Sequence, residues 1–289
     1  MKNLVLINRN GQELDLLRNR NFILSGVEGL HGIDVDIGES ESPYTDGSNI
    51  ETVKALPRGI ELELTLRGDV EEAINAVTSV VKSKQIVTLK EETDKGEITV
   101  KGVVSIPPYS RMLQSCKISL SLYCGQPYWE DLVQVVADIS ESIGLLFFPV
   151  EGQYFTFDGR PFGVLDTSLE KEFVNDGDTD VGMIVTINTY GEVTNPRISC
   201  SSGTQEGWWM EIRTTLDDDD EVEISTVRGN KYVTINGSEI YKGQPVADFF
   251  KFNGNDWLQL EQGKNIFNIT AESGVTNLHY SISYKRRYE

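Results

Sequence analysis

The sequence is poor in the residues that build most catalytic and metal sites. Its 289 residues include two histidines, His31 and His279, and three cysteines. The HExxH, CxxC and GxSxG motifs are all missing from it, which removes the usual anchors of zinc proteases, zinc fingers and serine hydrolases. An odd number of cysteines does not form a disulfide framework. We therefore expect no enzyme, no metal site and no cofactor.

Basic charge is scarce as well. The chain carries 45 acidic and 26 basic residues, which gives a formal net charge of −19. A surface this negative repels a phosphate backbone, so binding of nucleic acid through a basic patch is not expected.

Long hydrophobic runs are also missing. The best internal run, residues 145–150, is interrupted by Pro149 and is far shorter than the roughly 20 residues that span a bilayer. Near the N-terminus, residues 4–7 are too few for a signal-peptide core of roughly 7 to 15 apolar residues. We expect no membrane insertion, and a protein that is made in a cytoplasm and left there.

Two acidic segments are weak candidates for a cation site. Asp176, Asp178 and Asp180 have the spacing that opens a calcium loop, but the sixth and twelfth positions are Val181 and Ile187 instead of Gly and Glu. Residues 217–220 are four consecutive aspartates, whose side chains cannot all converge on one ion. We interpret the first as an acidic loop and the second as a solvated hairpin tip.

The first half of the sequence predicts strands and one helix. Apolar and polar residues alternate at 60–66 and at 116–124, as in strands with one buried face. Residues 69–83 form an amphipathic helical pattern that Asp69 can cap. Between residues 38 and 57 the chain is polar and rich in turn residues, so we expect a long loop that is functional or mobile.

A domain boundary is expected just after the strand at 116–124. Gly125 and Pro127 end that strand, because Pro donates no ladder hydrogen bond, and Tyr128 and Trp129 follow. We predict a first domain at 1–133 and a second at 134–289, with Tyr128 and Trp129 as candidates for fixing the angle between them. Beyond residue 132 many short strands with turns between them favour a β-sandwich, with a loop or short turn between Phe162 and Phe173.

Three tryptophans are candidates for stacking on sugars. Trp208 and Trp209 are adjacent, so on a strand they face opposite ways, and Trp257 lies in a later segment. Packing in a core is the alternative for all three side chains. A carbohydrate-binding module that acts through the second domain is therefore the alternative function.

A set of motifs in order along the chain carries a family resemblance. In the first half these are FILSGVEGL at 22–30, Asp46-Gly47, LPRG at 56–59, the strand at 60–66, the single helix, and CKISLSLYCGQPYWED at 116–131. In the second half they are the segments at 143–149, 175–178, 195–196, 221–226, 233–237, 263–265 and 282–289. In this order the chain resembles the distal tail proteins of phages with siphovirus-type tails.

The resemblance implies a mainly β fold and a structural role. The first domain would be a tail-tube-like β-sandwich or barrel with one α-helix, and the second a galectin-like or carbohydrate-module-like β-sandwich. Members of the family form a homohexameric ring that joins the tail tube to the baseplate. The segment at 38–57 would be an arm to a neighbouring subunit, with Tyr44, Asp46 and Gly47 as contact candidates. The acidic balance suits a lumen through which DNA passes without binding.

The resemblance also implies where the protein acts and with what. Its partners would be further copies of itself, the tail tube protein, a tail-tip or tail-fibre protein, and a receptor-binding protein or cell-surface glycan. It would be assembled in the cytoplasm of a host bacterium and reside in the virion at the tail tip. A prophage-derived tail-like particle is the alternative to an infectious phage.

Overall fold

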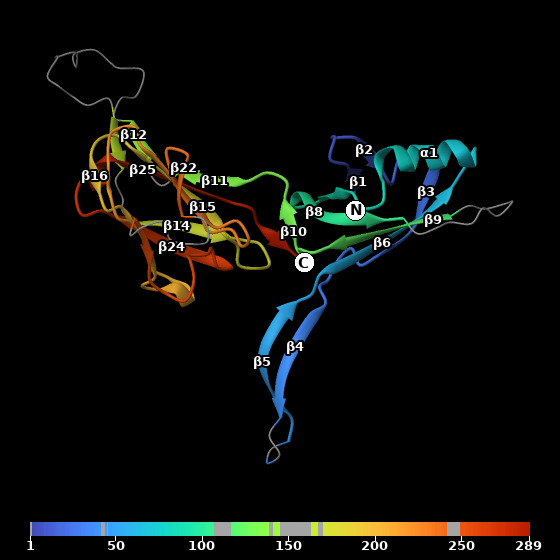
Figure 1. Cartoon of the computed structure of the whole chain (residues 1–289), viewed down its shortest axis with the longest axis horizontal. Helices are drawn as coiled ribbons and strands as arrows, with labels where there is room; N and C mark the ends of the chain where they lie inside the picture. Colours follow the sequence, from blue (N-terminus) through green and yellow to red (C-terminus); the bar gives the residue numbers. More distant parts are fainter. Residues whose placement is uncertain are drawn as a thin grey trace, which may run out of the picture. The chain divides into compact units, whose positions relative to one another are not determined.

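The chain folds into two compact units in the computed structural model (Figure 1). The first domain comprises Met1–Val133 with Arg287–Glu289, and the second comprises Gln134–Arg286. The structure describes residues 2–41, 44, 46–106, 117–138, 141–144, 163–166, 170–241 and 249–289.

One antiparallel sheet builds the first domain. Seven of its strands are hydrogen-bonded in the order β2-β1-β7-β8-β9-β6-β3, and β10 pairs with β8 and with β26. The strands are β1 (Asn3–Ile7), β2 (Glu13–Asp15), β3 (Phe22–Glu28), β6 (Arg58–Leu66), β7 (Ile86–Thr93), β8 (Gly96–Ser105), β9 (Lys117–Cys124), β10 (Trp129–Asp131) and β26 (Arg287–Tyr288).

The alternation seen in the sequence builds the core of this domain. Strands β6 and β9 lie side by side with Ile60 opposite Leu122 and Leu64 opposite Ile118, and all four side chains are buried. Cys124 at the end of β9 is a buried free thiol, and burial raises its pKa to about 11. Cys116, the other cysteine of this strand pattern, lies outside the described residues.

The predicted helix is present as α1 (Val70–Val80), the one α-helix among the described residues. The Asp69 carboxylate caps it by accepting a hydrogen bond from the backbone N–H of Glu71 at 2.8 Å. Ala73, Ile74 and Val77 turn inward and join the core of the sheet. In the described part of the chain, no helix has the length and apolar character to span a bilayer.

The last three residues pack with the first domain and not with the second. We expected them in the second domain, but β26 pairs with β10 of the first, with Tyr288 opposite Trp129. The Arg287 guanidinium donates a hydrogen bond to the Glu130 carboxylate at 2.9 Å, and the Tyr288 hydroxyl donates one to Asp131 at 3.2 Å. These contacts return the chain to the first domain.

Two antiparallel sheets build the second domain. The six-stranded sheet has the order β11 (Val135–Asp138), β25 (Leu278–Tyr284), β15 (Met183–Thr189), β20 (Glu221–Ser225), β21 (Tyr232–Ile235) and β22 (Ser238–Tyr241). The five-stranded sheet has the order β14 (Glu170–Asn175), β24 (Gly263–Thr270), β17 (Arg197–Cys200), β18 (Trp209–Ile212) and β23 (Phe250–Phe252). Short pairs add β12 (Glu141–Gly144) with β13 (Gly163–Asp166) and β16 (Val193–Thr194) with β19 (Thr215–Leu216).

The two large sheets share one hydrophobic core. Val185 and Ile224 come from the six-stranded sheet, Ile212 and Phe267 come from the five-stranded sheet, and all four lie in one buried cluster. The expected mainly β fold is thereby confirmed. Our expectation of a loop between Phe162 and Phe173 is wrong, because β13 and the start of β14 pair there with β12 and β24.

Two buried donors meet on the carbonyl oxygen of Leu30. The indole N–H of Trp129 donates to it at 2.9 Å, and the Arg58 guanidinium donates to it as well. Trp129 is fully buried and Arg58 nearly so, and burial lowers the pKa of Arg58. Gly29, at φ +73°, lies so near the Gly59 carbonyl oxygen that a Cβ there would collide with it. We call these contacts the Leu30 clamp.

We predict that Trp129 variants separate the packing of this clamp from its hydrogen bond. Trp129→Ala should destabilise the first domain by about 3–5 kcal/mol, because it empties a fully buried site. Trp129→Phe should cost about 1 kcal/mol beyond lost packing, since Arg58 still donates to the carbonyl.

Hydrogen–deuterium exchange of β10 and β26 peptides measures both changes, with second-domain peptides as the internal reference. Tyr123→Ala is the control, because that side chain is 61% exposed. Equal exchange in Trp129→Ala and Tyr123→Ala would contradict the clamp.

Candidate assembly arm and outer sheet face

The segment expected to be a long loop is a β-hairpin. Strands β4 (Val35–Glu41) and β5 (Ser48–Ala55) pair antiparallel with each other and, among the described residues, with no other strand. Figure 1 shows the hairpin extending away from β6 and the rest of the first domain. The loop prediction was wrong because both faces are exposed, so no buried residues mark the strands. We call residues 35–55 the arm.

The arm nevertheless has one apolar face. Val35 lies opposite Ala55, Ile37 opposite Val53, and Glu39 opposite Ile50. Because alternate residues of the regular strand β4 share a face, their partners on β5 share it too. Val35, Ile37, Ile50 and Val53 are 49%, 45%, 65% and 64% exposed. These four residues form what we call the apolar arm face, which also carries the exposed Glu39, and Asp36, Thr52 and Lys54 point the other way.

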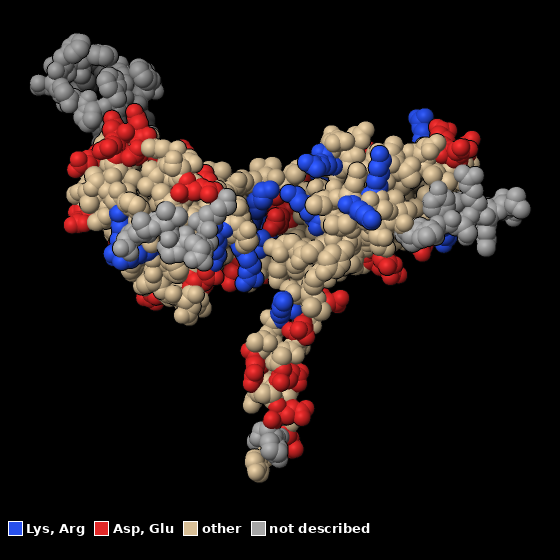
Figure 2. Space-filling model, viewed as in Figure 1, with Lys and Arg blue, Asp and Glu red and all other residues tan. Residues whose placement is uncertain are grey.

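Acidic residues run along the same hairpin. Residues 35–55 contain five acidic side chains and one basic one, and Figure 2 shows acidic atoms gathered along the arm. The acidic residues are Asp36, Glu39, Glu41, Asp46 and Glu51, and the basic residue is Lys54. The arm therefore combines an apolar face with a negative charge that disfavours association between arms.

The contact candidates of the arm lie at its tip, between the two strands. The Tyr44 side chain is 93% exposed, and Asp46 is exposed. Gly47 takes φ +86°, a left-handed conformation that favours glycine, just before β5 begins. Contact of these three residues with another subunit stays a prediction.

Tyr128 and Trp129, the pair proposed to fix the angle between the domains, differ in burial. Trp129 lies in the Leu30 clamp within the first domain, and Tyr128 is half-buried. Their role in the angle between the domains stays a prediction.

The three candidate tryptophans have different surroundings in the second domain. Trp257 is 2% exposed and packs against Tyr241 and Phe250, with ring centroids 5.0 and 4.8 Å away. Trp208 packs against the core and covers Gly254, where a Cβ would collide with its ring. Trp209 is half-buried on the outer face of β18. Only Trp209 therefore faces outward from the sheet.

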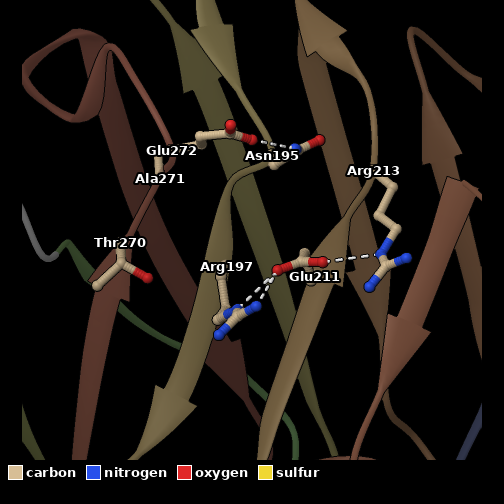
Figure 3. Close-up of a pocket in the computed structure, with 7 residues that line it drawn as sticks. All are labelled: Asn195, Arg197, Glu211, Arg213, Thr270, Ala271 and Glu272. Atoms are coloured by element: carbon tan, nitrogen blue, oxygen red, sulfur yellow. Dashed lines mark hydrogen bonds and ion pairs between the residues drawn. The ribbon is translucent and has the colours of Figure 1, made fainter.

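An arginine–carboxylate cluster lies beside Trp209 on that outer face. Glu211 accepts hydrogen bonds from Nε of Arg197 at 2.7 Å and from Nε of Arg213 at 2.9 Å, so it lies between two guanidinium groups. The Arg197 guanidinium also lies 4.3 Å from the centroid of the Trp209 ring. Figure 3 shows Arg197 and Arg213 on either side of Glu211, below the hydrogen bond between Asn195 and Glu272.

These residues line an open cavity of about 490 Å³. Its lining consists of Asn195, Arg197, Glu211, Arg213, Thr270, Ala271 and Glu272. No sequence pattern predicts this cluster. The alternation of side chains in β17 and β18 places Arg197, Trp209 and Glu211 on one face of the sheet. The register that brings Arg197 opposite Glu211 is a long-range pairing that single-strand patterns do not specify.

The two arginines determine the ionisation of Glu211. Burial alone would raise its pKa, but hydrogen bonds and charge from Arg197 and Arg213 outweigh that effect and hold the pKa of Glu211 below its ordinary value. The side chain is 9% exposed and yet ionised at neutral pH. It is a fixed negative charge within a sheet surface.

Several carboxylates of the two acidic segments have partners within the chain. Asp176 pairs with Arg286, whose Nη1 lies 2.9 Å from a carboxylate oxygen, and Asp180 accepts the backbone N–H of Gln262. Asp220 accepts the backbone N–H of Asp217 at 2.7 Å. Across the described ranges, no three His, Cys, Asp or Glu side chains are grouped to hold a metal ion.

The second domain matches a known protein family in sequence. Residues 176–288 match the family model described as the C-terminal domain of siphovirus-type tail components. Among curated proteins, none matches the chain.

The whole chain matches solved structures in fold. The crystal structure of the Dit protein (gp 19.1) of phage SPP1 matches with a TM-score of 0.66 and 14% identity, over 99% of each chain. Its description calls that protein a paradigm of the hub adsorption apparatus in phages that infect Gram-positive bacteria. The expected resemblance to the distal tail protein family is confirmed. The shared fold extends over both domains, including the residues before 176 that the family model does not match.

Chains of the phage P2 baseplate in its activated conformation also match. The form with Ca has a TM-score of 0.47 and 11% identity over 99% of this chain and 98% of that one. The form with Sr has a TM-score of 0.46 and 11% identity over 98% and 97%.

We predict a pH-dependent contribution of Glu211 to the stability of the second domain. Because its folded-state pKa is lowered, its ionised form adds stability above the unfolded pKa of about 4.3, and that stability is lost as the pH falls through the folded-state pKa. Glu211→Gln should therefore reduce the free energy of unfolding by about 1–2 kcal/mol at pH 7. This figure is lower than for a fully buried ion pair, because both arginines are partly exposed and solvent screens their charge.

Denaturant unfolding of the second domain from pH 7 to pH 3 measures this effect. The gap between wild type and Glu211→Gln should narrow as the pH falls, while exposed Glu206→Gln should stay near wild type throughout. A gap that is constant over the whole range would contradict the prediction.

Proposed function

We propose that the chain is a structural hub of a phage tail tip, in which copies of the protein form a homohexameric ring between tail tube and baseplate. The match to the tail-component family model and to the Dit structure supports the hub. The resemblance to the distal tail family supports a ring of six copies. The proposal assigns the protein no catalytic role. It places the protein in the virion, after assembly in the host cytoplasm.

The single observation that carries this proposal is the apolar arm face. A two-stranded hairpin is marginally stable in water unless its apolar side packs on something. Four aliphatic side chains on this face are about half exposed or more within one chain. A second copy of the chain is the partner that a self-assembling ring supplies, and each copy then buries the arm of its neighbour.

The base of the arm suits such a contact. The Leu30 clamp lies where the chain enters and leaves the hairpin, because Leu30 precedes β4 and Arg58 begins β6. Near the strands, the backbone N–H of Leu56 donates to the carbonyl of Asp34 at 2.8 Å. A firmly held base reduces the conformational entropy that the arm loses on docking.

The second domain would provide the outward contacts of the hub. Its core is separate from that of the first domain, so it can carry adhesion partners without altering the ring-forming sheet. The proposed partners are a tail-tip or tail-fibre protein and a receptor-binding protein. The tail tube protein would contact the ring of first domains.

The test compares two neighbouring positions on β5 that face opposite ways. Val53→Asp puts a charge on the apolar arm face, and Thr52→Asp puts the same charge on the polar face. If the apolar face docks on another copy, Val53→Asp should raise the concentration needed for assembly at least about 10-fold, because it removes apolar burial and buries a charge. Thr52→Asp should assemble like the wild type.

Native mass spectrometry and light scattering of the purified chain measure the oligomer distribution. Electron microscopy of labelled particles then locates the protein. Equal assembly of the two variants would overturn the role of the apolar arm face, and absence of the label from the distal end of the tail would overturn the hub.

A further inference from the structure

The outer face of the first-domain sheet carries a short row of exposed apolar side chains. Ile86 on β7 lies opposite Val103 on β8, and Val103 lies opposite Tyr123 on β9. Residues that lie opposite one another across strands share a face of the sheet. These three side chains are 62%, 43% and 61% exposed, and their neighbours within each strand are buried. We call Ile86, Val103 and Tyr123 the apolar row.

Three lysines lie beside the apolar row. Lys82 and Lys84 come shortly before Ile86, and the backbone N–H of Lys84 donates to a carbonyl of β8 at 2.9 Å. Lys101 lies on the same face of β8, two residues before Val103. Across the described ranges, none of the three lysines forms a side-chain hydrogen bond or an ion pair. The row is therefore bordered by unpaired positive charge in a chain whose net charge is −19.

The arm presents the complementary groups in a matching order. On β4, Val35 and Ile37 lie toward the base of the hairpin, and Glu39 and Glu41 follow on the same face toward its tip. Neither glutamate forms an ion pair in the described part of the chain. The apolar row crosses three strands and is roughly 10 Å long, and the stretch from Val35 to Glu39 is roughly 13 Å long.

We propose that the apolar row of one copy receives the arm of a second copy, with the aliphatic arm residues on the row and Glu39 and Glu41 beside Lys82 and Lys84. This inference rests on the proposed hub, because it names the surface on which the arm would dock. Burial of apolar side chains on both partners supplies the affinity. The opposite charges at one end determine the direction in which the arm lies.

The arm of the same chain does not cover this row. Tyr123 lies opposite Gly59, at the root of the arm, and Figure 1 shows the hairpin extending away from the sheet. To reach the row, the hairpin would have to fold back over its own base. The arm on the row therefore comes from another copy. Because arm and row are different surfaces, the contact is head to tail, and its repetition closes a ring or extends a filament.

The competing explanation is an ordinary solvated sheet surface. Singly exposed apolar side chains are normal on proteins, and Ile, Val and Tyr favour strands. That explanation predicts that a charge on the row leaves self-assembly unchanged. A row that receives a different protein, such as the tail tube protein, makes the same prediction for the purified chain.

The first experiment introduces the same charge at two exposed aliphatic positions of one sheet. Val103→Asp lies in the apolar row. Ile23→Asp is the matched control, because Ile23 is 38% exposed on the outer face of the edge strand β3. Val103→Asp should raise the concentration needed for assembly at least about 10-fold, because docking would bury a charge in place of an apolar group. Ile23→Asp should assemble like the wild type, by native mass spectrometry and light scattering.

A mixture of two defective variants tests whether arm and row bind each other. Val53→Asp keeps an intact row, and Val103→Asp keeps an intact arm, so each variant supplies what the other lacks. We expect a one-to-one mixture to form heterodimers that do not close into rings, because only one of the two possible contacts in each pair is intact. Isotope labelling of one variant distinguishes the two chains by mass.

An exchange of charges tests the direction of the arm and leaves the apolar packing unchanged. Lys82→Glu with Lys84→Glu, or Glu39→Lys with Glu41→Lys, should weaken assembly several-fold, because like charges then meet. All four substitutions in one chain should restore assembly. All four side chains are exposed, so neither pair of substitutions disturbs the core.

The outcomes separate this contact from the hub. If Val103→Asp assembles like Ile23→Asp, if the mixture stays monomeric, or if the fourfold variant assembles no better than the double variants, the row is overturned as the receiving surface. The hub then still stands on the difference between Val53→Asp and Thr52→Asp. If those two variants assemble equally, the arm has no role and this contact is overturned with it. A wild type that stays monomeric at every concentration would also overturn the contact and leave the hub to the labelling of particles.

Discussion

The carbonyl oxygen of Leu30 accepts hydrogen bonds from two buried side chains, and the first domain is arranged around that contact. Arg58 and Trp129 come from segments almost 30 and 100 residues further along the chain. A buried guanidinium is costly unless it finds acceptors, so the clamp restricts where β6 begins and where β10 lies. The three sequence segments that meet there are also motifs on which the family resemblance rests. These three motifs are far apart in the sequence and meet at one carbonyl group.

The Leu30 clamp also lies at the base of the exposed arm, which we propose takes part in assembly. The arm has no core of its own, and its strands pair with each other alone in the described part of the chain. Its direction is therefore set at its base, where Leu30 and Arg58 hold the two ends of the excursion together. In the assembly that we propose, the apolar arm face supplies the affinity for a second copy, and the surrounding acidic residues disfavour contact between two arms. In this proposal, the residues that hold the base of the arm, those that bind a second copy and those that repel another arm are different residues of one segment.

Sequence patterns predicted the elements whose signal is local. The alternation in β6 and β9 and the Asp69 cap of α1 depend on neighbouring residues, and the structure contains all three. Sequence patterns did not predict the features that depend on contacts between residues far apart in the chain, or on the lack of such contacts. The arm has no buried face to mark its strands, β26 belongs to the first domain only through β10, and the pairing of Arg197 with Glu211 needs the register of two strands. Strand patterns identify the polar residues of the outer sheet face one by one, but they do not predict that these residues lie together.

The position of β26 has a consequence for biosynthesis. The first domain receives its final strand from residues that follow the entire second domain in the chain. A ribosome therefore releases the second domain before the edge beside β10 can be completed. During that interval the backbone of β10 has an unpaired side, and Trp129 lacks its cross-strand neighbour Tyr288. The first domain thus reaches its final form only after synthesis of the second domain is complete.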